Sequence, residues 1–408
     1  MANGMRVVIE RMPHVPSASA GFLVLTGARD EIAPLAGVSH FLEHMMFKGT
    51  AKRDWRDITL AFDRIGSTYN AYTSEDRTMY YGWVRANDLP AQLELLADMM
   101  RPVLPEEEFQ TERKVILEEI AMSKDQLEHV AFDFLQEKVF AGHPLAWPIL
   151  GYDATVAALT RDQMYDYYRR RYTADNMMLV VTGDVDPARV IGLAEELCGS
   201  WGRSTASAQR VPPRMHGGVD VLVLERFKQQ ILALTFPAVS AADPLDETAS
   251  VAATILGGEN SRFFWNIMQA GLSPRAGAVH LAYSDCGAML LYASCQPENC
   301  EQVYTAIRKE SEAIGRELVQ PHEVERVKNR RRTSLAVESE APFSRLTQIM
   351  DDMEHRGYPR TVEQMLADVD AVTAESIRDY LARYPINVEG HLASVGPRRW
   401  PESNGRTR

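Results

Sequence analysis

Short β-patterned segments alternate with amphipathic helical segments along the first half of the chain. Stretches rich in β-branched residues with alternating polarity predict strands, whereas apolar residues three and four positions apart predict helices. Strands are expected at 5–11, 19–26, 69–73, 78–84 and 177–182. Helices are expected at 37–47, 56–65, 89–100, 106–124 and 161–172. Long helices mixed with strands in this order predict an α+β fold.

The second half of the chain repeats part of this pattern. Five residues across a helix and the strand after it recur at one constant offset, with Thr160, Tyr167, Arg170, Leu179 and Gly183 matching Thr373, Tyr380, Arg383, Leu392 and Gly396. The recurrence indicates an internal duplication, although five matches can also arise by chance. Residues 201–218 are rich in Ser, Pro, Gly and Arg and interrupt both periodicities, which predicts a linker at 206–218. We therefore expect two homologous α+β domains, 1–205 and 219–408, joined by this linker, each with a mixed or antiparallel sheet that carries helices on one side.

Length, charge and cysteine usage narrow the class of protein. A chain of 408 residues exceeds one ordinary core, which agrees with two domains. Its formal net charge of −12 argues against a nucleic-acid surface and against adhesion to membranes. The chain contains no apolar run long enough to predict a membrane span, and its first residues lack the hydrophobic core of a signal peptide. The four cysteines show no CxxC spacing. We expect a cytoplasmic protein, or a periplasmic one if a signal peptide has been removed.

The strongest chemical signal is the segment HFLEH, from His40 to His44, inside the helix expected at 37–47. Positions i and i+4 lie on one face of a helix, so His40 and His44 can reach the same metal ion. Glu43 lies one residue before the second histidine, where it can contact a metal-bound water without being a ligand. This HxxEH order is the inverse of the commoner HExxH zinc motif. The alternative, a helix histidine pair without a metal, is disfavoured because chance matches are uncommon.

A third ligand is expected on another helix, because catalytic zinc uses three protein ligands and leaves the fourth position to water. The helix expected at 106–124 offers Glu112, Glu118 and Glu119. At about 100° per residue, Glu118 points away from the apolar face, while Glu112 and Glu119 lie together at its border. A partly buried carboxylate is costly unless it is paired or bound to a cation. We therefore assign Glu119 as the third ligand and Glu112 as its neighbour, with a simple salt bridge as the alternative for Glu112.

Seven segments in order carry a resemblance to a known family: NGMRVVIERMP, TGARDE, GVSHFLEHMMFKGT, YNAYTSEDRTMYYG, ERKVILEEI, HPLAWPILG and RRYTADNMMLVVTGDV. The chain resembles the pitrilysin and mitochondrial processing peptidase family, the inverzincins. The resemblance implies one Zn²⁺ held by His40, His44 and Glu119, with Glu43 as the general base and Glu112 supporting the site.

The resemblance further implies two homologous α+β domains that close like a clamshell around an unfolded peptide. The peptide substrate of this family adds as a strand to a sheet edge near the zinc. The matching positions here are Asn70, Ala71 and Tyr72, which an ordinary hairpin strand would also explain.

The second half departs from the family where an Arg and a Tyr normally contact the substrate carbonyl. The matching stretch reads SRFFWNIMQAGLSPRAGAVHLAY, with Met268 at the Arg position and Pro274 near the Tyr position. Two remedies stay open. A homologous chain in a homodimer or heterodimer supplies the Arg and the Tyr, which we favour, or the local residues Arg262, Arg275 and Tyr283 replace them.

The sequence therefore predicts a zinc metalloendopeptidase subunit that cleaves unfolded peptides or processing segments. A non-catalytic or weakly active interaction subunit of a heteromeric peptidase is the main alternative. The presence of Glu43 favours catalysis, because a structural zinc site uses four protein ligands and needs no base. A zinc enzyme acting on a small non-peptide substrate has no supporting motif.

Overall fold

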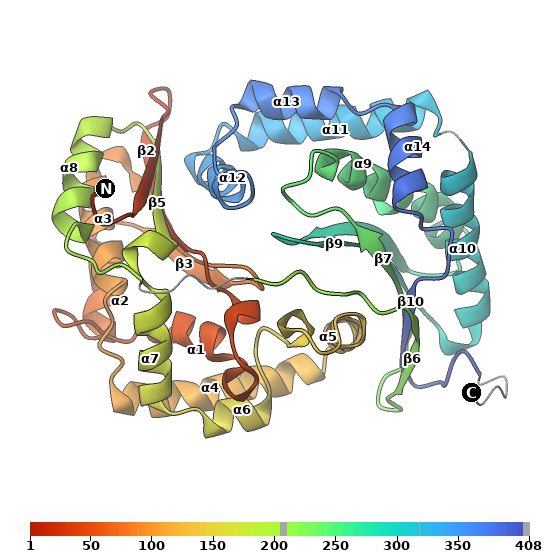
Figure 1. The fold of residues 1–408 in the computed structure, drawn as a ribbon, viewed down its shortest axis with the longest axis horizontal. Coiled ribbons are helices and arrows are strands. Elements are labelled where there is room, and N and C mark those ends of the chain that lie inside the picture. Colours follow the sequence, from red (N-terminus) through yellow and green to blue (C-terminus); the bar gives the residue numbers. More distant parts are fainter. Residues whose placement is uncertain (205–209, 318, 403–408) are drawn as a thin grey trace. The chain divides into compact units, whose positions relative to one another are not determined.

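The computed structural model describes residues 1–204, 210–317 and 319–402, and the chain divides into two compact units (Figure 1). Unit 1 comprises Met1–Ala121, Trp147–Arg210 and Ala336–Arg360, and unit 2 comprises Met122–Ala146, Val211–Leu335 and the residues from Thr361 on. Each half of the chain thus gives one segment to the other unit. The predicted domains, 1–205 and 219–408, are contiguous and do not include this exchange.

The predicted linker is only partly described. Residues 206–209 of the linker lie outside the described residues. From Arg210 to Gly217 the chain forms neither helix nor strand, and β6 begins at Gly218.

Unit 1 contains a mixed five-stranded sheet with the order β1-β5-β2-β4-β3. The pair β1–β5 is parallel and the other pairs are antiparallel. The strands are β1 (Arg6–Arg11), β2 (Ser17–Val24), β3 (Thr68–Thr73), β4 (Thr78–Arg85) and β5 (Met177–Gly183). The helices of this unit are α1 (Val38–Met45), α2 (Trp55–Arg64), α3 (Leu89–Met99), α4 (Glu106–Lys124), α6 (Asp153–Ala158), α7 (Arg161–Arg171), α8 (Pro187–Cys198) and α12 (Pro342–His355).

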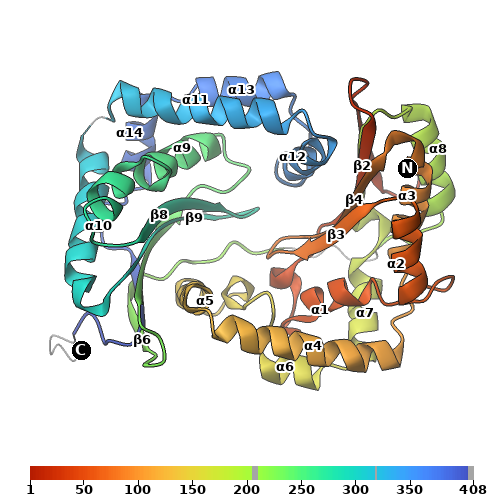
Figure 2. The same cartoon turned by 180° about the vertical axis from the view of Figure 1, so that it is seen from behind.

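Both faces of the unit 1 sheet are apolar, because successive side chains of a strand point to opposite faces. Ala20 and Phe22 of β2 belong to the main core. Leu23 belongs to a second cluster on the other face, together with Ile349 and Met350 of α12. Helix α12 covers the second face of the sheet, so unit 1 carries helices on both faces. Figure 2 shows α12 beside β2 and β4.

Unit 2 repeats this architecture with the strand order β6-β10-β7-β9-β8. Its strands are β6 (Gly218–Val223), β7 (Gln230–Ala238), β8 (Arg275–Ala282), β9 (Gly287–Cys295) and β10 (His391–Gly396). Its helices are α5 (Leu127–Val139), α9 (Asp246–Gly257), the π-helix Phe264–Met268, α10 (Cys300–Arg316), α11 (Pro321–Glu338), α13 (Val362–Asp370) and α14 (Ala374–Arg383). Here α5, from the first half of the chain, packs on β7 and β10.

The duplication inferred from the sequence is visible in matched local structure. Thr160 and Thr373 each begin a helix as N-cap with a reciprocal capping box. Gly183 and Gly396 each end the following strand with positive φ, 121° and 155° respectively. The expected fold class, two mixed α+β domains of similar build, is confirmed. Among the described helices, none has the length and apolarity needed to cross a membrane.

Candidate metal centre

Helix α1, which carries HFLEH, begins at the buried carboxyl group of Glu31. Gly37 is the N-cap with φ of 96°, and its missing side chain avoids the carbonyl oxygen of Leu150, which a Cβ would approach to 2.7 Å. The buried carboxylate of Glu31 accepts the backbone N–H groups of Gly37 and Ser39, both at 2.7 Å. These bonds satisfy two donors at the positive end of the helix. Glu31 therefore fixes where α1 starts.

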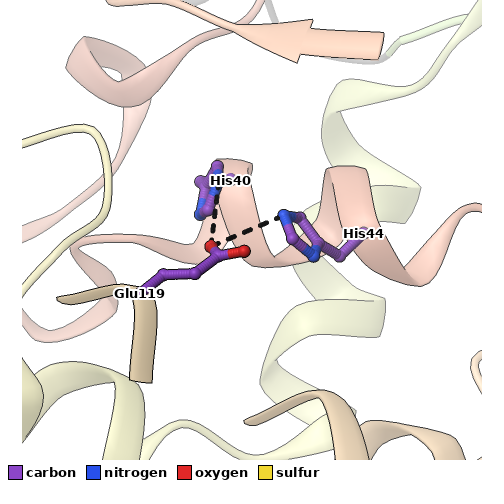
Figure 3. Close-up of side chains that lie close together, drawn as sticks. All are labelled: His40, His44 and Glu119. Carbon is purple, nitrogen blue, oxygen red and sulfur yellow. Dashed lines mark ion pairs between the residues drawn. The ribbon is translucent and has the colours of Figure 1, made fainter. Parts of the chain in front are cut away.

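His40 and His44 lie on one face of α1, with ring centroids 4.7 Å apart. Glu119 of α4 faces both rings, and its Oε2 lies 3.9 Å from Nε2 of His40 and 3.8 Å from Nε2 of His44 (Figure 3). One ligand atom from each residue lies within 4.8 Å of the others. Two ligands of tetrahedral zinc are separated by roughly 3.4 Å, so this set of two imidazoles and one carboxylate fits zinc.

The helical-face argument for α4 agrees with the structure. Phe109 is fully buried and stacks on Phe41 of α1 with centroids 4.7 Å apart, which sets α4 against α1. Glu118 is exposed, whereas Glu119 is only half-buried and faces the histidines. The structure thus gathers the predicted ligand set at one place, and the role of these residues as zinc ligands stays a prediction.

Glu112 contacts the opposite nitrogen of His44. Its Oε1 lies 2.8 Å from Nδ1 of His44, and its Oε2 lies 2.6 Å from Nζ of Lys48. Although burial opposes ionisation, the bonds to His44 and Lys48 lower the pKa of Glu112 overall. A carboxylate on the distal nitrogen fixes the orientation and tautomer of a ligating histidine. Glu112 therefore orients His44 and does not join the converging ligand atoms.

The two histidines experience different electrostatic surroundings. Burial, followed by repulsion from His44, lowers the pKa of His40 to about 3, so His40 is neutral and keeps a lone pair for a metal. Burial also acts to lower the pKa of His44, but the nearby carboxylates, chiefly Glu112, raise it overall. Within the described residues, the buried Nδ1 of His40 has no hydrogen-bond partner. The carboxyl groups of Glu43, Glu112 and Glu119 outnumber the one nearby lysine, Lys48. Such surroundings favour a cation bound by the two histidines.

Glu43 points to strand β3 and not into the converging ligand set. Its Oε2 accepts a 2.6 Å hydrogen bond from the hydroxyl of Thr73, the last residue of β3. Burial raises the pKa of Glu43, and the bonds from Thr73 offset part of that increase. The predicted general base therefore lies next to the predicted ligands, and a strand distant in sequence fixes its orientation.

The predicted substrate-binding residues lie on the edge strand β3, which pairs only with β4 in the described sheet. Asn70 is exposed, Ala71 is buried and Tyr72 is half-buried. The backbone N–H of Ala71 donates to Oδ1 of its own neighbour Asn70 at 2.9 Å. This side-chain bond occupies a backbone donor on the strand nearest to Glu43.

The local substitutes considered for the missing Arg and Tyr are all engaged in unit 2. Arg262 donates to both carboxylate oxygens of Glu323, at 2.8 and 2.9 Å. Arg275 forms an ion pair with Glu128 of α5. Tyr283 is buried, with its ring edge-to-face on Phe140.

Sequence reasoning assigned no role to three residues that orient the site: Glu31, Lys48 and Thr73. Each lies inside a segment that carries the family resemblance, namely TGARDE, GVSHFLEHMMFKGT and YNAYTSEDRTMYYG. Membership of those segments was the available signal. Their function depends on contacts with residues 6 to 64 positions away, which no local periodicity encodes.

Two family models match this chain. The model described as insulinase (peptidase family M16) matches residues 6–153, and the model described as peptidase M16 inactive domain matches residues 158–331. All the candidate site residues therefore fall in the first match. The second match contains Met268 and Pro274, the positions that depart from the family pattern.

Relatives of the whole chain are known as zinc proteases. An uncharacterised zinc protease of Mycobacterium tuberculosis H37Rv is 31% identical and covers 97% of this chain and 92% of its own. An uncharacterised zinc protease of Bacillus subtilis is 29% identical and covers 97% of both. A solved protease from Helicobacter pylori has a TM-score of 0.90 at 19% identity, covering 97% of this chain and 98% of that one. A solved peptidase M16 inactive domain from Pseudomonas fluorescens has a TM-score of 0.89 at 17% identity, covering 98% and 97%.

Proposed function

This chain belongs to peptidase family M16, and on that premise we propose that it is a zinc metalloendopeptidase subunit that hydrolyses bonds in unfolded peptides or processing segments. One observation carries the proposal. Nitrogen and oxygen atoms of His40, His44 and Glu119 lie within 4.8 Å of one another, while the adjacent carboxylate of Glu43 accepts a hydrogen bond from Thr73. Three protein ligands with a nearby base are typical of catalytic zinc, whereas structural zinc uses four ligands.

The proposed chemistry divides between the metal and the side chains. His40, His44 and Glu119 hold one zinc ion per chain. When bound, zinc lowers the pKa of a coordinated water to about 7 and polarises the scissile carbonyl. Glu43 takes the proton of the attacking water and delivers it to the leaving amine. Glu112 keeps His44 in the orientation that presents Nε2 to the ligand position.

The edge of β3 is the proposed binding site for an extended peptide. An added strand forms backbone hydrogen bonds with an exposed sheet edge, and those bonds do not depend on the side chains of the peptide. The backbone N–H of Ala71 offers such a donor once the side chain of Asn70 releases it. Tyr72 borders Thr73, so the added peptide runs close to Glu43. This arrangement suits unfolded substrates.

A second chain is proposed to complete the site. Arg262 and Arg275 form ion pairs, and Tyr283 is buried, so each local substitute would have to break existing contacts to reach a substrate. A homologous chain that carries the Arg and the Tyr meets the need without that cost. The loss of one such donor typically costs about 2.7 to 4 kcal/mol of transition-state stabilisation.

A non-catalytic interaction subunit remains the second candidate. The match of residues 158–331 to a model described as an inactive domain favours it, together with the Met268 and Pro274 departures. Under this alternative the zinc site supports the fold, and the chain contributes only binding.

Zinc content and peptide cleavage measured on the same samples test the proposal. The parent chain should bind one zinc and cleave a quenched peptide library weakly, and cleavage should rise at least about tenfold when a homologue with the Arg and Tyr but no HxxEH is added. Glu43→Gln should keep zinc and lose nearly all cleavage, while Glu118→Gln on α4 should keep both. Cleavage by Glu43→Gln at close to the parent rate would refute the assigned base. Zinc binding without cleavage in any combination would favour the interaction subunit.

A further inference from the structure

The tip of the β3–β4 hairpin, residues 74–77, is held on one side by helix α12. The Nη1 atom of Arg77 forms ion pairs with Glu354, at 2.8 Å, and with Asp351. The side chain of Glu354 is only 3% exposed, and the guanidinium of Arg77 also lies over the ring of Tyr72. Because an uncompensated buried carboxylate is costly, Glu354 has a strong preference for keeping this partner. Arg77 therefore fastens the hairpin to a helix more than 270 residues later in the chain.

On the other side the tip is held by Arg210, the last residue of unit 1 before the chain enters unit 2 at Val211. Arg210 donates through Nε and Nη2 to the two carboxylate oxygens of Asp30, at 3.2 and 2.7 Å. Its Nη1 lies 3.1 Å from Oδ1 of Asp76, and its Nη2 donates to the carbonyl of Asp76. Asp76 also receives the buried guanidinium of Arg29 at 2.9 Å. This ion cluster joins the hairpin tip to the turn before α1.

The hairpin tip and that turn are joined through the backbone as well. The N–H groups of Ala28 and Arg29 donate to the carbonyls of Ser74 and Glu75, both at 3.0 Å. A Cβ on Gly27 would lie 2.3 Å from the carbonyl oxygen of Ser74, so only glycine permits this approach. The same turn supplies Glu31, the cap of α1, and the same hairpin supplies Thr73, the partner of Glu43. The hairpin tip therefore stabilises both the turn that carries Glu31 and the strand that carries Thr73.

We infer that Arg77 and Arg210 are positioning residues, which together hold the hairpin tip so that the hydroxyl of Thr73 stays on the carboxylate of Glu43. The inference rests on the proposed function, because it concerns the same base. Both residues tie the tip to chain that continues into unit 2: α12 lies in a segment that unit 2 flanks on both sides, and Arg210 directly precedes that unit. Displacement of the base by about 1 Å can cost a hundredfold in rate, so two ion clusters at this point control activity without touching substrate.

Single and double glutamine variants of Arg77 and Arg210 test the inference. In the double variant, kcat per folded, zinc-loaded protein should fall at least about tenfold, with zinc affinity within about twofold of the parent value. Hydrogen exchange at the amides of Ala28, Arg29 and Ser74 should accelerate at the same time. Arg85→Gln is the matched control on β4, because its pair with Asp88 involves an 81% exposed side chain. It should leave both measurements unchanged.

If a glutamine variant folds poorly, lysine variants replace it. They keep the positive charge of each arginine and change only the number of nitrogen atoms that reach its partners. Arg77 reaches both of its partners through one nitrogen, so Arg77→Lys should retain nearly the parent kcat. Arg210 uses three nitrogens, so Arg210→Lys should stay folded and still lose activity. Unchanged exchange at the hairpin tip in the double glutamine variant would overturn the inference. If the parent chain binds zinc but cleaves no peptide with or without a homologous chain, the proposed function fails, and the exchange measurement alone decides the inference.

Discussion

Glu118 and Glu119 are adjacent glutamates on α4 with opposite surroundings. Glu119 lies within 3.9 Å of both histidine Nε2 atoms, while Glu118 is exposed. A substitution that keeps volume and removes charge therefore isolates the geometric difference between the two positions.

Glu119→Gln should lower zinc affinity by at least about a hundredfold, because an amide oxygen is a poor replacement for an anionic ligand. Glu118→Gln should leave zinc affinity within about twofold. Titration of the metal-free proteins with zinc in a competing chelator measures both. Stoichiometric tight zinc in Glu119→Gln, with loss in Glu118→Gln, would reverse the assignment of the third ligand.

At the scale of single elements, strand β8 contains a buried histidine that links stability to pH. The Nε2 atom of His280 bonds to the carbonyl of Val239 at 2.9 Å, and its ring is buried. Burial lowers the pKa of His280 below 6.5, although the bond to Val239 acts in the opposite direction. Below pH 6.5 the unfolded chain binds a proton that the folded chain excludes, so this contribution to stability is present above pH 6.5 and is lost as pH falls.

His280→Gln should reduce the loss of unfolding free energy between pH 7 and pH 5 by about 1 kcal/mol, because glutamine can donate to Val239 and does not titrate. Urea unfolding at several pH values measures the difference. Identical pH profiles for His280→Gln and the parent would contradict the prediction.

Helix α12 stabilises unit 1 through apolar side chains that reach the second face of the sheet. Met350 is 1% exposed and belongs to the cluster with Leu23 and Met178. It also packs closely over Gly21, where a Cβ would come within 2.9 Å of its terminal methyl carbon.

Met350→Ala should destabilise the protein by about 2 to 5 kcal/mol, since it opens a cavity in a closely packed cluster. Val337→Ala, at a position that is 61% exposed, should change stability by less than about 0.5 kcal/mol. Thermal or denaturant unfolding compares the pair. Equal stability of the two variants would show that α12 is not bound to the sheet in solution.

At the scale of the whole molecule, each unit contains a segment from the other half of the chain. Neither half alone therefore contains every element of its own unit. A fragment of residues 1–205 lacks α12 and leaves the apolar cluster of β2, β4 and β5 uncovered. Large exposed apolar patches on soluble proteins promote association.

The fragment 1–205 should therefore aggregate or stay partly unfolded, whereas residues 1–210 joined by a flexible linker to residues 336–360 should fold and bind zinc. Size-exclusion chromatography and zinc content check the two designs. A monomeric, zinc-binding 1–205 fragment would show that the exchanged helix is dispensable.

The sequence alone determined the features that depend on local spacing. Two histidines four positions apart share a helix face, and the period of α4 separates Glu119 from Glu118, so the ligand set could be predicted without a fold. Recurrent caps and glycines, such as Thr160 with Thr373, likewise indicated the duplication because they act within one turn of a helix or one strand end.

Tertiary structure alone decided which distant segments support these local features. The exchange of α5 and α12 between units depends on long-range packing, since α12 covers the second apolar face of the unit 1 sheet and α5 packs on β7 and β10 of the unit 2 sheet. In the same way, Glu31, Thr73 and Arg210 acquire their roles only when the turn before α1 meets the hairpin tip. Contacts of this kind are fixed by the packing of whole elements, which residue spacing does not encode.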